Sequence, residues 1–386
     1  MIDIGPIHRK EYEFGRDRST PICVGEAPGR IHYLGEHSEQ GAGLFLSSAI
    51  NRYVRVAVSP RNDSALRFFA ADAGEHKRTS IPNLRYRRED RWANHMKAAV
   101  QVFVNLGFPV KGLNFTMMRD IPKNAGLGST EAVEMAALFA LKALFRAPTK
   151  NRLLVANLLE VKKEYYGKNY SPVDYLISIE ARKDQFLVID EGAGEIRKIK
   201  SPLTKYSLLV TNSKVPRFGI EDDMHERQEE VAKAKRRLAI TRPGATLRSL
   251  VNADLREALA GIPEEARRMT THVIREYKRI SGAEEALKAG DIPALAKIFA
   301  HSQESLRDLY EVSCPEIDWL VKRTQEMEGV AGSRMTGRGF GGCTFTFITE
   351  EAIPQYQKRL EEYERIFGFQ PIVYEMKMVP GVHLAE

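Results

Sequence analysis

Residues 121–141 have the sequence I-P-K-N-A-G-L-G-S-T-E-A-V-E-M-A-A-L-F-A-L, in which a glycine-rich turn leads into a helix-forming run. The preceding residues, 112–118, alternate like a half-buried strand. Gly126 and Gly128 allow backbone conformations in which several amide N–H groups point at one site. A helix N-terminus adds free N–H donors and a partial positive charge, so this strand–turn–helix unit is suited to bind a phosphate.

The hydroxyl groups that follow this turn leave two interpretations open. Ser129 and Thr130 could reach a phosphate-bound Mg²⁺, or they could cap the helix beside an ordinary glycine turn. The pattern G-x-x-x-x-G-K-S/T does not occur here, so the unit is not a Walker P-loop.

Length and composition describe a chain of 386 residues with 43% hydrophobic and 28% charged residues, typical of a soluble globular protein with a sizeable core. At this length two domains are expected. No apolar run is long enough to cross a bilayer and the N-terminus lacks the apolar core of a signal peptide, so we expect no membrane partner. Cys23, Cys314 and Cys343 cannot all pair and match no zinc spacing, which favours a cytoplasmic location.

The net charge of +7 is compatible with a polyanionic ligand, either nucleic acid or a nucleoside triphosphate. The densest basic run, residues 233–237, lies in a segment with helical periodicity, and no aromatic residues stand between its charges. We therefore interpret it as a solvated helix face and expect no nucleic-acid partner.

A second polar stretch, residues 28–39, has the sequence P-G-R-I-H-Y-L-G-E-H-S-E and follows a strand predicted over 22–27. It places one Arg, two His and two Glu around glycines in a turn at the end of that strand. This concentration of ionisable groups favours a polar ligand site, with a charged surface loop as the alternative.

Predicted strands and helices mix along the whole chain, which favours an α+β fold over a helical bundle. The segment 224–301 is mostly helical and follows a strong strand over 206–211, and we place a domain boundary at this change of composition. The N-terminal domain is then 1–205 and the C-terminal domain 206–386. The glycine-rich run at 337–342 leads into a strand rather than a helix, so it is not a dinucleotide-binding turn.

Several stretches together resemble the galactokinase branch of the GHMP kinase superfamily. The run at 28–39 resembles the galactokinase signature G-R-V-N-L-I-G-E-H-T-D, and residues 122–134 resemble the second superfamily motif, P-x-x-x-G-L-x-S-S-x-x-x-E. Residues 332–343, G-S-R-M-T-G-R-G-F-G-G-C, resemble the third motif. Residues 305–318 are similar to a galactokinase segment, and R-W-A-N-H-M-K at 91–97 is a weaker match. The matches follow the family's order and extend over most of the chain.

This resemblance implies a two-domain GHMP-kinase-like α+β fold with the active site in the cleft between the domains. It also implies an ATP-dependent sugar kinase that uses Mg²⁺ and phosphorylates the anomeric C1 hydroxyl of a monosaccharide such as galactose. A monomer is expected. Kinases for a different sugar and non-catalytic sugar- and ATP-binding sensors are the alternatives on this scaffold, although the presence of Ser129 and Asp174 favours an enzyme.

The implied site residues follow from the resemblance position by position. Asp174 takes the place of the catalytic Asp, either as a base or only to orient the hydroxyl, with Arg30 beside it. The other implied residues are Glu36, His37 and Glu39 with Asp174 for the sugar, Gly126, Leu127, Gly128, Ser129 and Thr130 for the ATP phosphates, Trp92 for the nucleotide, and Ser129 with Glu164 for Mg²⁺. Glu164 matches the family's Mg²⁺-assisting Glu only after a short deletion.

Four positions in the implied sugar pocket depart from the family pattern. His32 replaces an Asn, Glu39 an Asp, Ser171 a Gly and Asp222 a Tyr. Because a site built for particular hydroxyl groups rejects other arrangements, these changes predict that galactose is not clearly the best substrate.

Overall fold

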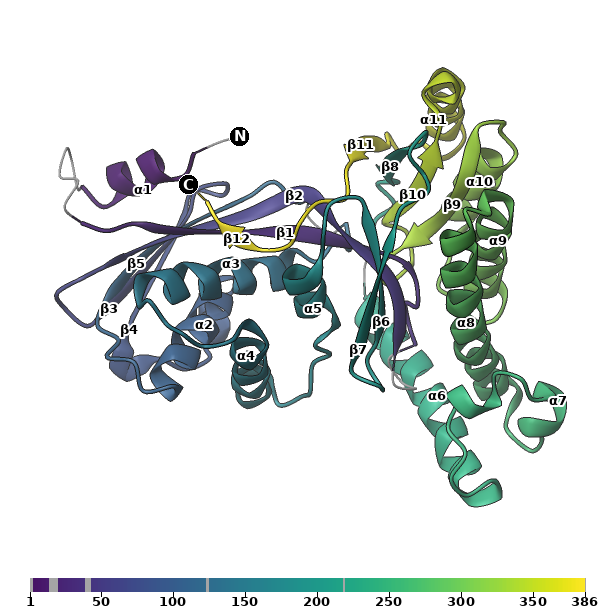
Figure 1. The fold of residues 1–386 in the computed structure, drawn as a ribbon, viewed down its shortest axis with the longest axis horizontal. Helices are drawn as coiled ribbons and strands as arrows, with labels where there is room; N and C mark the ends of the chain where they lie inside the picture. Colours follow the sequence, from purple (N-terminus) through teal and green to yellow (C-terminus); the bar gives the residue numbers. More distant parts are fainter. Residues whose placement is uncertain (1–2, 14–19, 39–42, 123–124, 218, 386) are drawn as a thin grey trace.

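The computed structural model describes residues 3–13, 20–38, 43–122, 125–217 and 219–385, which form two sheets with helices packed against them (Figure 1). The first sheet has eight strands and the second has four. This mixture of helices and sheets confirms the predicted α+β class. None of the described helices is both long and apolar enough to span a bilayer.

The first sheet is built from strands of the N-terminal half and one short strand near the C-terminus. Its path is β12-β1-β2-β5-β3-β4, and β6 joins it by pairing with β2 and with β7. The strands are β1 (Cys23–Leu34), β2 (Leu44–Pro60), β3 (Ala65–Ala70), β4 (Glu75–Ser80), β5 (Leu113–Arg119), β6 (Gln185–Asp190), β7 (Glu195–Lys200) and β12 (His383–Leu384).

Four helices lie together along one side of this sheet, and the short α1 (Gly5–Glu11) lies on the other (Figure 1). They are α2 (Ala93–Asn105), α3 (Ser129–Leu144), α4 (Asn151–Tyr166) and α5 (Val173–Glu180). Helix α3 can approach β1 closely because Gly25 has no side chain. A Cβ atom at Gly25 would lie 2.0 Å from the carbonyl oxygen of Ala136.

The second sheet has the antiparallel order β11-β8-β10-β9. Its strands are β8 (Ser207–Asn212), β9 (Val330–Thr336), β10 (Cys343–Ile348) and β11 (Ile372–Met376). The accompanying helices are α6 (Ile220–Thr241), α7 (Leu255–Ala258), α8 (Glu264–Ala289), α9 (Ile292–Asp308), α10 (Pro315–Gln325) and α11 (Ile353–Phe367). The domain boundary predicted between residues 205 and 206 falls in the connection from β7 to β8 and stays a prediction.

An aromatic cluster joins the two sheets. The ring of Tyr33 in β1 lies 5.1 Å from that of Phe186 in β6, and 5.1 and 5.4 Å from those of Phe345 and Phe347 in β10. Aromatic pairs at these separations contribute packing energy beyond the area they bury. The C-terminal end of β1, a strand of the first sheet, is therefore also packed against β10 of the second sheet.

Strand β1 is longer than the sequence predicted. The expected strand ended at residue 27, with a polar turn after it, but β1 continues to Leu34. The polar residues are paired in register with β2, with Arg30 opposite Ala49 and His32 opposite Ser47. Since alternate strand residues face the same side, Arg30 and His32 point in one direction.

Candidate active site

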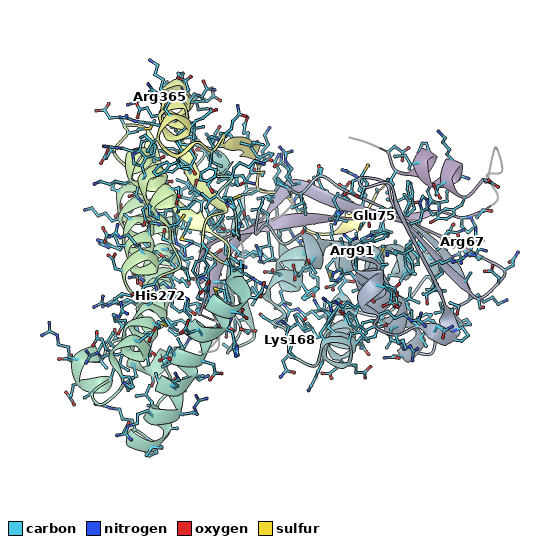
Figure 2. The ribbon with its side chains drawn as sticks, turned by 180° about the vertical axis from the view of Figure 1, so that it is seen from behind. Arg67, Glu75, Arg91, Lys168, His272 and Arg365 are labelled. Atoms are coloured by element: carbon cyan, nitrogen blue, oxygen red, sulfur yellow. The ribbon has the colours of Figure 1, made fainter. Side chains whose placement is uncertain are left out.

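A cleft of about 1100 Å³ lies where the two sheets meet. Its walls come from β1, the turn before α3, the start of α5, the connection after β8, the start of α6 and the loop between β9 and β10. Lys168, one of the lining residues, lies near the junction between the two halves of the molecule in Figure 2. Segments that are far apart in the sequence therefore form one cavity.

Asp174 is held at the cleft wall by two basic side chains from β1. Arg30 donates from Nε to Oδ1 at 2.9 Å and from Nη2 to Oδ2 at 2.7 Å, which is a bidentate pair. Nε2 of His32 lies 3.0 Å from Oδ1, and Nδ1 of the same ring lies 2.7 Å from Oγ of Ser47. The alternation of β1 brings Arg30 and His32 to the same carboxylate.

These neighbours keep Asp174 ionised. Burial alone would raise the pKa of this carboxyl group, but the charge of Arg30 and the hydrogen bond from His32 hold the pKa well below its usual range. The side chains of Arg30 and Asp174 stay 16% and 18% exposed, so a ligand in the cleft can reach the pair.

The glycine turn before α3 packs directly on Arg30. The Arg30 backbone N–H donates to Leu127 O at 3.0 Å, and its guanidinium donates to Gly126 O. Gly128 is the N-cap of α3 with a φ of 74°, and its Cα faces the Arg30 side chain, where a Cβ atom would lie 3.0 Å from Cγ. Only glycine adopts this conformation easily at such a close approach.

All five residues predicted for the ATP phosphates line the cleft, and the N-terminus of α3 opens into it. Ser129 is the first residue of α3, and no side chain caps this helix end. The alternative interpretation of the turn required a hydroxyl group to cap the first N–H groups of α3. The structure shows no such cap.

Glu36 and His37 also line the cleft, at the end of β1. Glu36 accepts a hydrogen bond from Arg334 Nη1 at 2.8 Å and one from the Gly337 backbone N–H. His37 stacks on Tyr310 with the ring centroids 4.7 Å apart, and burial holds the pKa of its imidazole well below the usual value. Its Nε2 atom is buried without a hydrogen-bond partner, so His37 has an unused polar atom at the cleft.

Two of the predicted site residues do not line the cleft. Glu164 is exposed on α4, and the cleft lining does not include it. Trp92 precedes α2 and donates from Nε1 to Glu75 Oε2 at 2.8 Å. Figure 2 labels Glu75 and Arg91 within the part formed by the first sheet, away from the junction. Glu39 lies outside the described residues.

The positions that depart from the family pattern have different places in the structure. His32 and Ser171 line the cleft, and the Ser171 hydroxyl accepts a hydrogen bond from Val173 N at 3.2 Å. Asp222 is exposed in the first turn of α6 and is not part of the lining. Two of the four differences therefore lie beside Asp174.

Glu131 was missed by sequence analysis and lines the cleft beside Ser129 and Thr130. Burial and the neighbouring carboxylates of Asp174 and Glu134 raise the pKa of Glu131. Within the described part of the chain no hydrogen bond or ion pair to its carboxyl group is recorded. An acidic residue in the first turn of a helix, beside a turn predicted to bind phosphate, was the available signal in the sequence.

A buried polar network supports the wall behind Glu131. Glu134 pairs with Lys162 Nζ at 3.1 Å and with His95 Nδ1 at 2.8 Å, and Tyr175 donates to it as well. Lys162, and not the exposed Glu164, is the α4 residue whose side chain reaches this network. The face of α4 that packs against this network therefore carries the cation Lys162, whereas the acidic Glu164 had been expected there.

Three protein-family models match the chain. The galactokinase galactose-binding signature matches residues 9–60, the GHMP kinase N-terminal domain 94–181 and the GHMP kinase C-terminal domain 283–365. Among curated proteins, the putative galactokinase of Treponema pallidum is 35% identical, over 100% of this chain and 96% of its own length. The galactokinase of Roseiflexus sp. is 30% identical, over 99% and 97% of the two chains. The human galactokinase is 31% identical, over 91% and 89%.

Solved structures agree with these matches at the level of the fold. The structure of Lactococcus lactis galactokinase complexed with galactose superposes with a TM-score of 0.90, at 23% identity over 98% of this chain and 99% of the other. The mevalonate kinase of Methanococcus jannaschii superposes with a TM-score of 0.66, at 19% identity over 92% and 98%. The arrangement of two sheets around a cleft is therefore shared with kinases of small molecules.

Proposed function

The chain belongs to the galactokinase family of GHMP kinases, and from this membership and the chemistry of the cleft we propose that it transfers the γ-phosphate of ATP to the C1 hydroxyl of a monosaccharide such as galactose. The observation that carries the proposal is the Arg30–Asp174 pair packed against the turn before α3. Phosphoryl transfer depends mainly on positioning and on stabilising charge, and this arrangement offers both.

Asp174 acts on the attacking hydroxyl in this proposal. Its pKa lies well below the usual range, so at neutral pH it is an anion that accepts a hydrogen bond but is a weak base. We infer that it orients the sugar hydroxyl and receives the proton only as the bond to phosphorus forms. Arg30 holds the carboxylate in place and stabilises the charge that develops on the transferred group.

The turn 126–130 and the N-terminus of α3 bind the phosphates of ATP. Uncapped amide N–H groups and the helix dipole favour an anion at this end of the helix. Because Arg30 touches both the turn and Asp174, the same side chain sets the distance between the phosphate and the hydroxyl.

The residues present at the cleft fit a Mg²⁺ ion that arrives with the nucleotide. No group of three or more His, Cys, Asp or Glu side chains suited to a metal occurs among the described residues, so phosphate oxygens and water would supply most ligands, as is usual for Mg²⁺. We propose Ser129 and Glu131 as the protein ligands in place of Ser129 and Glu164. The raised pKa of Glu131 supports this choice, since burial and the carboxylates of Asp174 and Glu134 outweigh the charges of Lys162 and Arg30, and a metal cation would offset that excess of negative charge. When bound, the ion neutralises charge on the phosphates.

The sugar occupies the other end of the cleft, where we propose that Glu36, His37 and Glu39 bind its hydroxyl groups. The unsatisfied Nε2 atom of His37 supports this assignment, because a buried polar atom without a partner is rare and a ligand hydroxyl would satisfy it. Glu36 is held in one orientation by Arg334 and the Gly337 amide, so the site is rigid before the sugar binds.

The test is ADP release from Mg·ATP with a panel of free sugars, namely galactose, glucose, mannose and N-acetylgalactosamine, followed by ³¹P NMR to identify the phosphorylated carbon. We expect a C1 phosphate and a rate that Asp174→Asn abolishes. Absence of ADP release with every sugar, in a protein that still binds ATP and sugar, would identify a sensor and overturn the proposal.

A further inference from the structure

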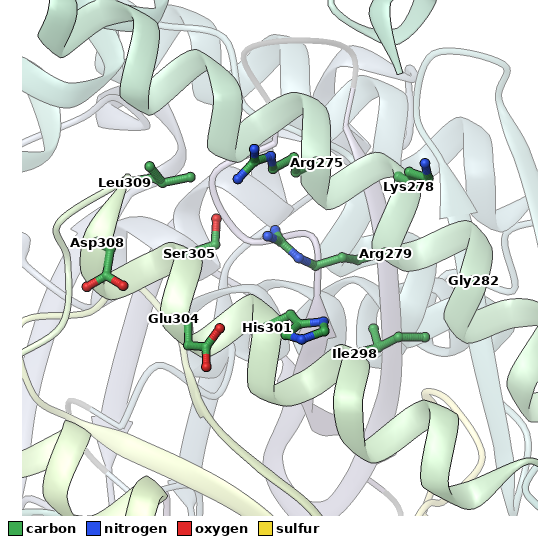
Figure 3. Close-up of a pocket in the computed structure, with 10 residues that line it drawn as sticks. All are labelled: Arg275, Lys278, Arg279, Gly282, Ile298, His301, Glu304, Ser305, Asp308 and Leu309. Carbon is green, nitrogen blue, oxygen red and sulfur yellow. The ribbon is translucent and has the colours of Figure 1, made fainter. Parts of the chain in front are cut away.

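A second cavity, of about 610 Å³, lies between residues 275–282 of α8 and residues 298–308 of α9, and we call it the α8–α9 groove (Figure 3). It shares no lining residue with the cleft where the sheets meet. The proposed kinase reaction makes no use of it.

The α8 wall of the groove is basic. Arg275, Lys278, Arg279 and Gly282 follow one another at helical spacing and so share one face of α8. Arg275 and Lys278 are exposed, and no hydrogen bond or ion pair of either is recorded within the described residues. Arg279 is largely buried and pairs through Nη1 with Glu276 Oε2 at 2.8 Å. Two free cations and one buried arginine therefore face the cavity.

The α9 wall carries hydroxyl and carboxylate groups. Figure 3 shows Ser305 opposite the guanidinium groups, with Glu304 and Asp308 farther along the groove. At the other end the helices come close, because a Cβ atom at Gly282 would lie 3.4 Å from Ile298 Cδ1. The cations on the α8 wall could therefore bind a phosphate group. The carboxylates on the α9 wall could accept hydrogen bonds from hydroxyl groups of the same ligand.

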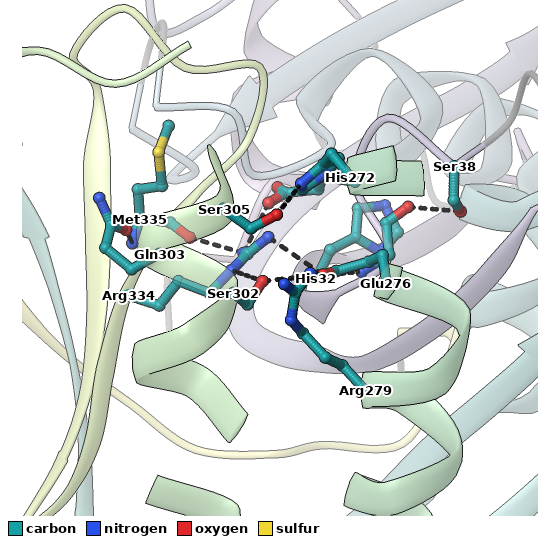
Figure 4. A network of polar contacts seen from close by, with 12 residues as sticks. His32, Ser38, His272, Glu276, Arg279, Ser302, Gln303, Ser305, Arg334 and Met335 are labelled. Carbon is teal, nitrogen blue, oxygen red and sulfur yellow. Dashed lines mark hydrogen bonds and ion pairs between the residues drawn. The ribbon is translucent and has the colours of Figure 1, made fainter. Parts of the chain in front are cut away.

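A chain of buried contacts leads from the groove to the cleft (Figure 4). Arg279 holds Glu276, whose Oε1 accepts from the Gly35 backbone N–H at 3.1 Å and lies 3.6 Å from Arg334 Nη2. Arg334 in turn donates from Nη1 to Glu36 Oε2 at 2.8 Å. Glu276 and Arg334 are fully buried, so a change at one is transmitted without screening by water.

We propose that the α8–α9 groove binds a phosphorylated polyhydroxy compound of the sugar phosphate class, and that its occupation weakens sugar binding in the cleft. This proposal rests on the proposed function, because a sugar phosphate is the class of product that the reaction forms. As the product accumulates, its binding in the groove would then weaken the binding of sugar in the cleft.

The coupling follows from competition for Arg279. A phosphate bound to Arg279 draws its guanidinium away from Glu276, which then attracts Arg334 more strongly. Arg334 is shared between Glu276 and Glu36, so Glu36 loses part of its support at the sugar site. Coupling between two sites is reciprocal, and we expect a change of about fivefold or more in each affinity.

The experiment is a calorimetric titration of the full chain with galactose 1-phosphate in the absence of nucleotide. Three proteins are compared: the wild type, the groove variant Arg275→Ala/Lys278→Ala, and the control Lys297→Ala/Lys322→Ala. The control removes two exposed cations from α9 and α10 outside the groove. Binding in the cleft itself is common to all three proteins, so their difference isolates the groove.

We expect the groove variant to lose one binding event, with an affinity at least tenfold weaker, while the control keeps it. Galactose 1-phosphate should also weaken galactose binding less in the groove variant than in the control. Equal binding by all three folded proteins, or equal losses in both variants, would overturn the proposal. These titrations need no turnover, so they test the groove separately from the kinase reaction. Binding in the groove without kinase activity would refute only the proposed function. Kinase activity without binding in the groove would refute only the proposal for the groove.

Discussion

Two arginine–carboxylate groups lie at or behind the cleft, and they differ in burial more than in chemistry. The Arg30–Asp174 pair is partly exposed, at 16% and 18%. Arg334 and Glu276 are each 0% exposed, and Glu36 is 6% exposed. The first group can exchange a protein partner for a ligand, whereas Arg334 and Glu276 have no access to water that could replace a lost partner.

This difference predicts which property each group controls. A buried charge that loses its partner is strongly destabilising, because the remaining charge stays unsolvated. When a partly exposed pair loses one member, water or a ligand can solvate the remaining charge, so the cost to stability is smaller. The buried group should therefore govern folding, and the accessible pair should govern turnover.

The largest effect is expected from Arg334→Met. The substitution leaves Glu36 and Glu276 buried beside an uncharged side chain, and we expect a loss of about 3–5 kcal/mol in the free energy of unfolding. Urea denaturation measures it. The control is Arg323→Met, which removes an exposed ion pair to Glu326 and should cost less than about 1 kcal/mol. Equal losses in the two variants would contradict the contrast between buried and accessible pairs.

The second largest effect is expected from acid, which should lower the free energy of unfolding through His272, a buried side chain near Glu276. His272 bonds to Ser305 within this region, and burial lowers the pKa of its imidazole to about 4 from 6.5. The folded state therefore resists the proton that the unfolded state accepts, so the stability is complete above about pH 6.5 and is lost as the pH falls toward 4. The shift corresponds to about 3 kcal/mol.

Denaturation curves across this pH range test the role of His272. His272→Asn should flatten the dependence of stability on pH. The exposed His301→Asn should leave that dependence unchanged. If the free energy of unfolding depends on pH equally in the wild type and in His272→Asn, His272 is not the cause of the acid sensitivity.

Asp174→Asn tests the accessible pair. We expect kcat to fall by on the order of 10² or more, since the anion that orients the hydroxyl is lost, while the free energy of unfolding falls less than in Arg334→Met. Steady-state kinetics and urea denaturation of the same protein measure both properties. The exposed Asp222→Asn serves as the control with unchanged kcat. Near-normal turnover in Asp174→Asn would refute its role.

The smallest effect is expected from Glu131→Gln. If Glu131 helps to hold Mg²⁺, the variant should need about tenfold more Mg²⁺ or Mn²⁺ for half-maximal binding of ATP, with little change in sugar affinity. Fluorescence titration with an ATP analogue and electron paramagnetic resonance of Mn²⁺ measure this directly. Glu164→Gln is the matched control on α4, and a stronger effect there than at Glu131 would return the metal to the position predicted from the sequence.

The sequence predicted the place of the glycine turn at the cleft better than that of the second carboxylate. Gly126 and Gly128 carry a local conformational requirement, which a short sequence expresses by itself. Glu164 was predicted from the family resemblance only after a two-residue deletion, and a shift of two residues turns a side chain through more than half a helical turn. The structure presents Lys162 inward and leaves Glu164 exposed.

The extent of β1 shows the same limit. Residues 28–34 begin with Pro-Gly and include Arg30 and His32, which locally favours a turn, but pairing with β2 satisfies their backbone and makes them a strand. Because of that strand, Arg30 and His32 point the same way and reach Asp174. The sequence contained all three residues, although their convergence depends on pairing between distant segments.

The sequence alone determined the α+β class, the family and the glycine turn before α3, because these depend on local periodicity, glycine conformation and ordered motifs. The tertiary structure decided which carboxylates face the cleft, which arginine is accessible and which is buried, and how the α8–α9 groove connects to Glu36. Burial and the direction of a side chain arise from contacts between segments that are far apart in the chain. Those contacts set the local dielectric environment, and with it the difference between a residue that binds substrate and one that stabilises the fold.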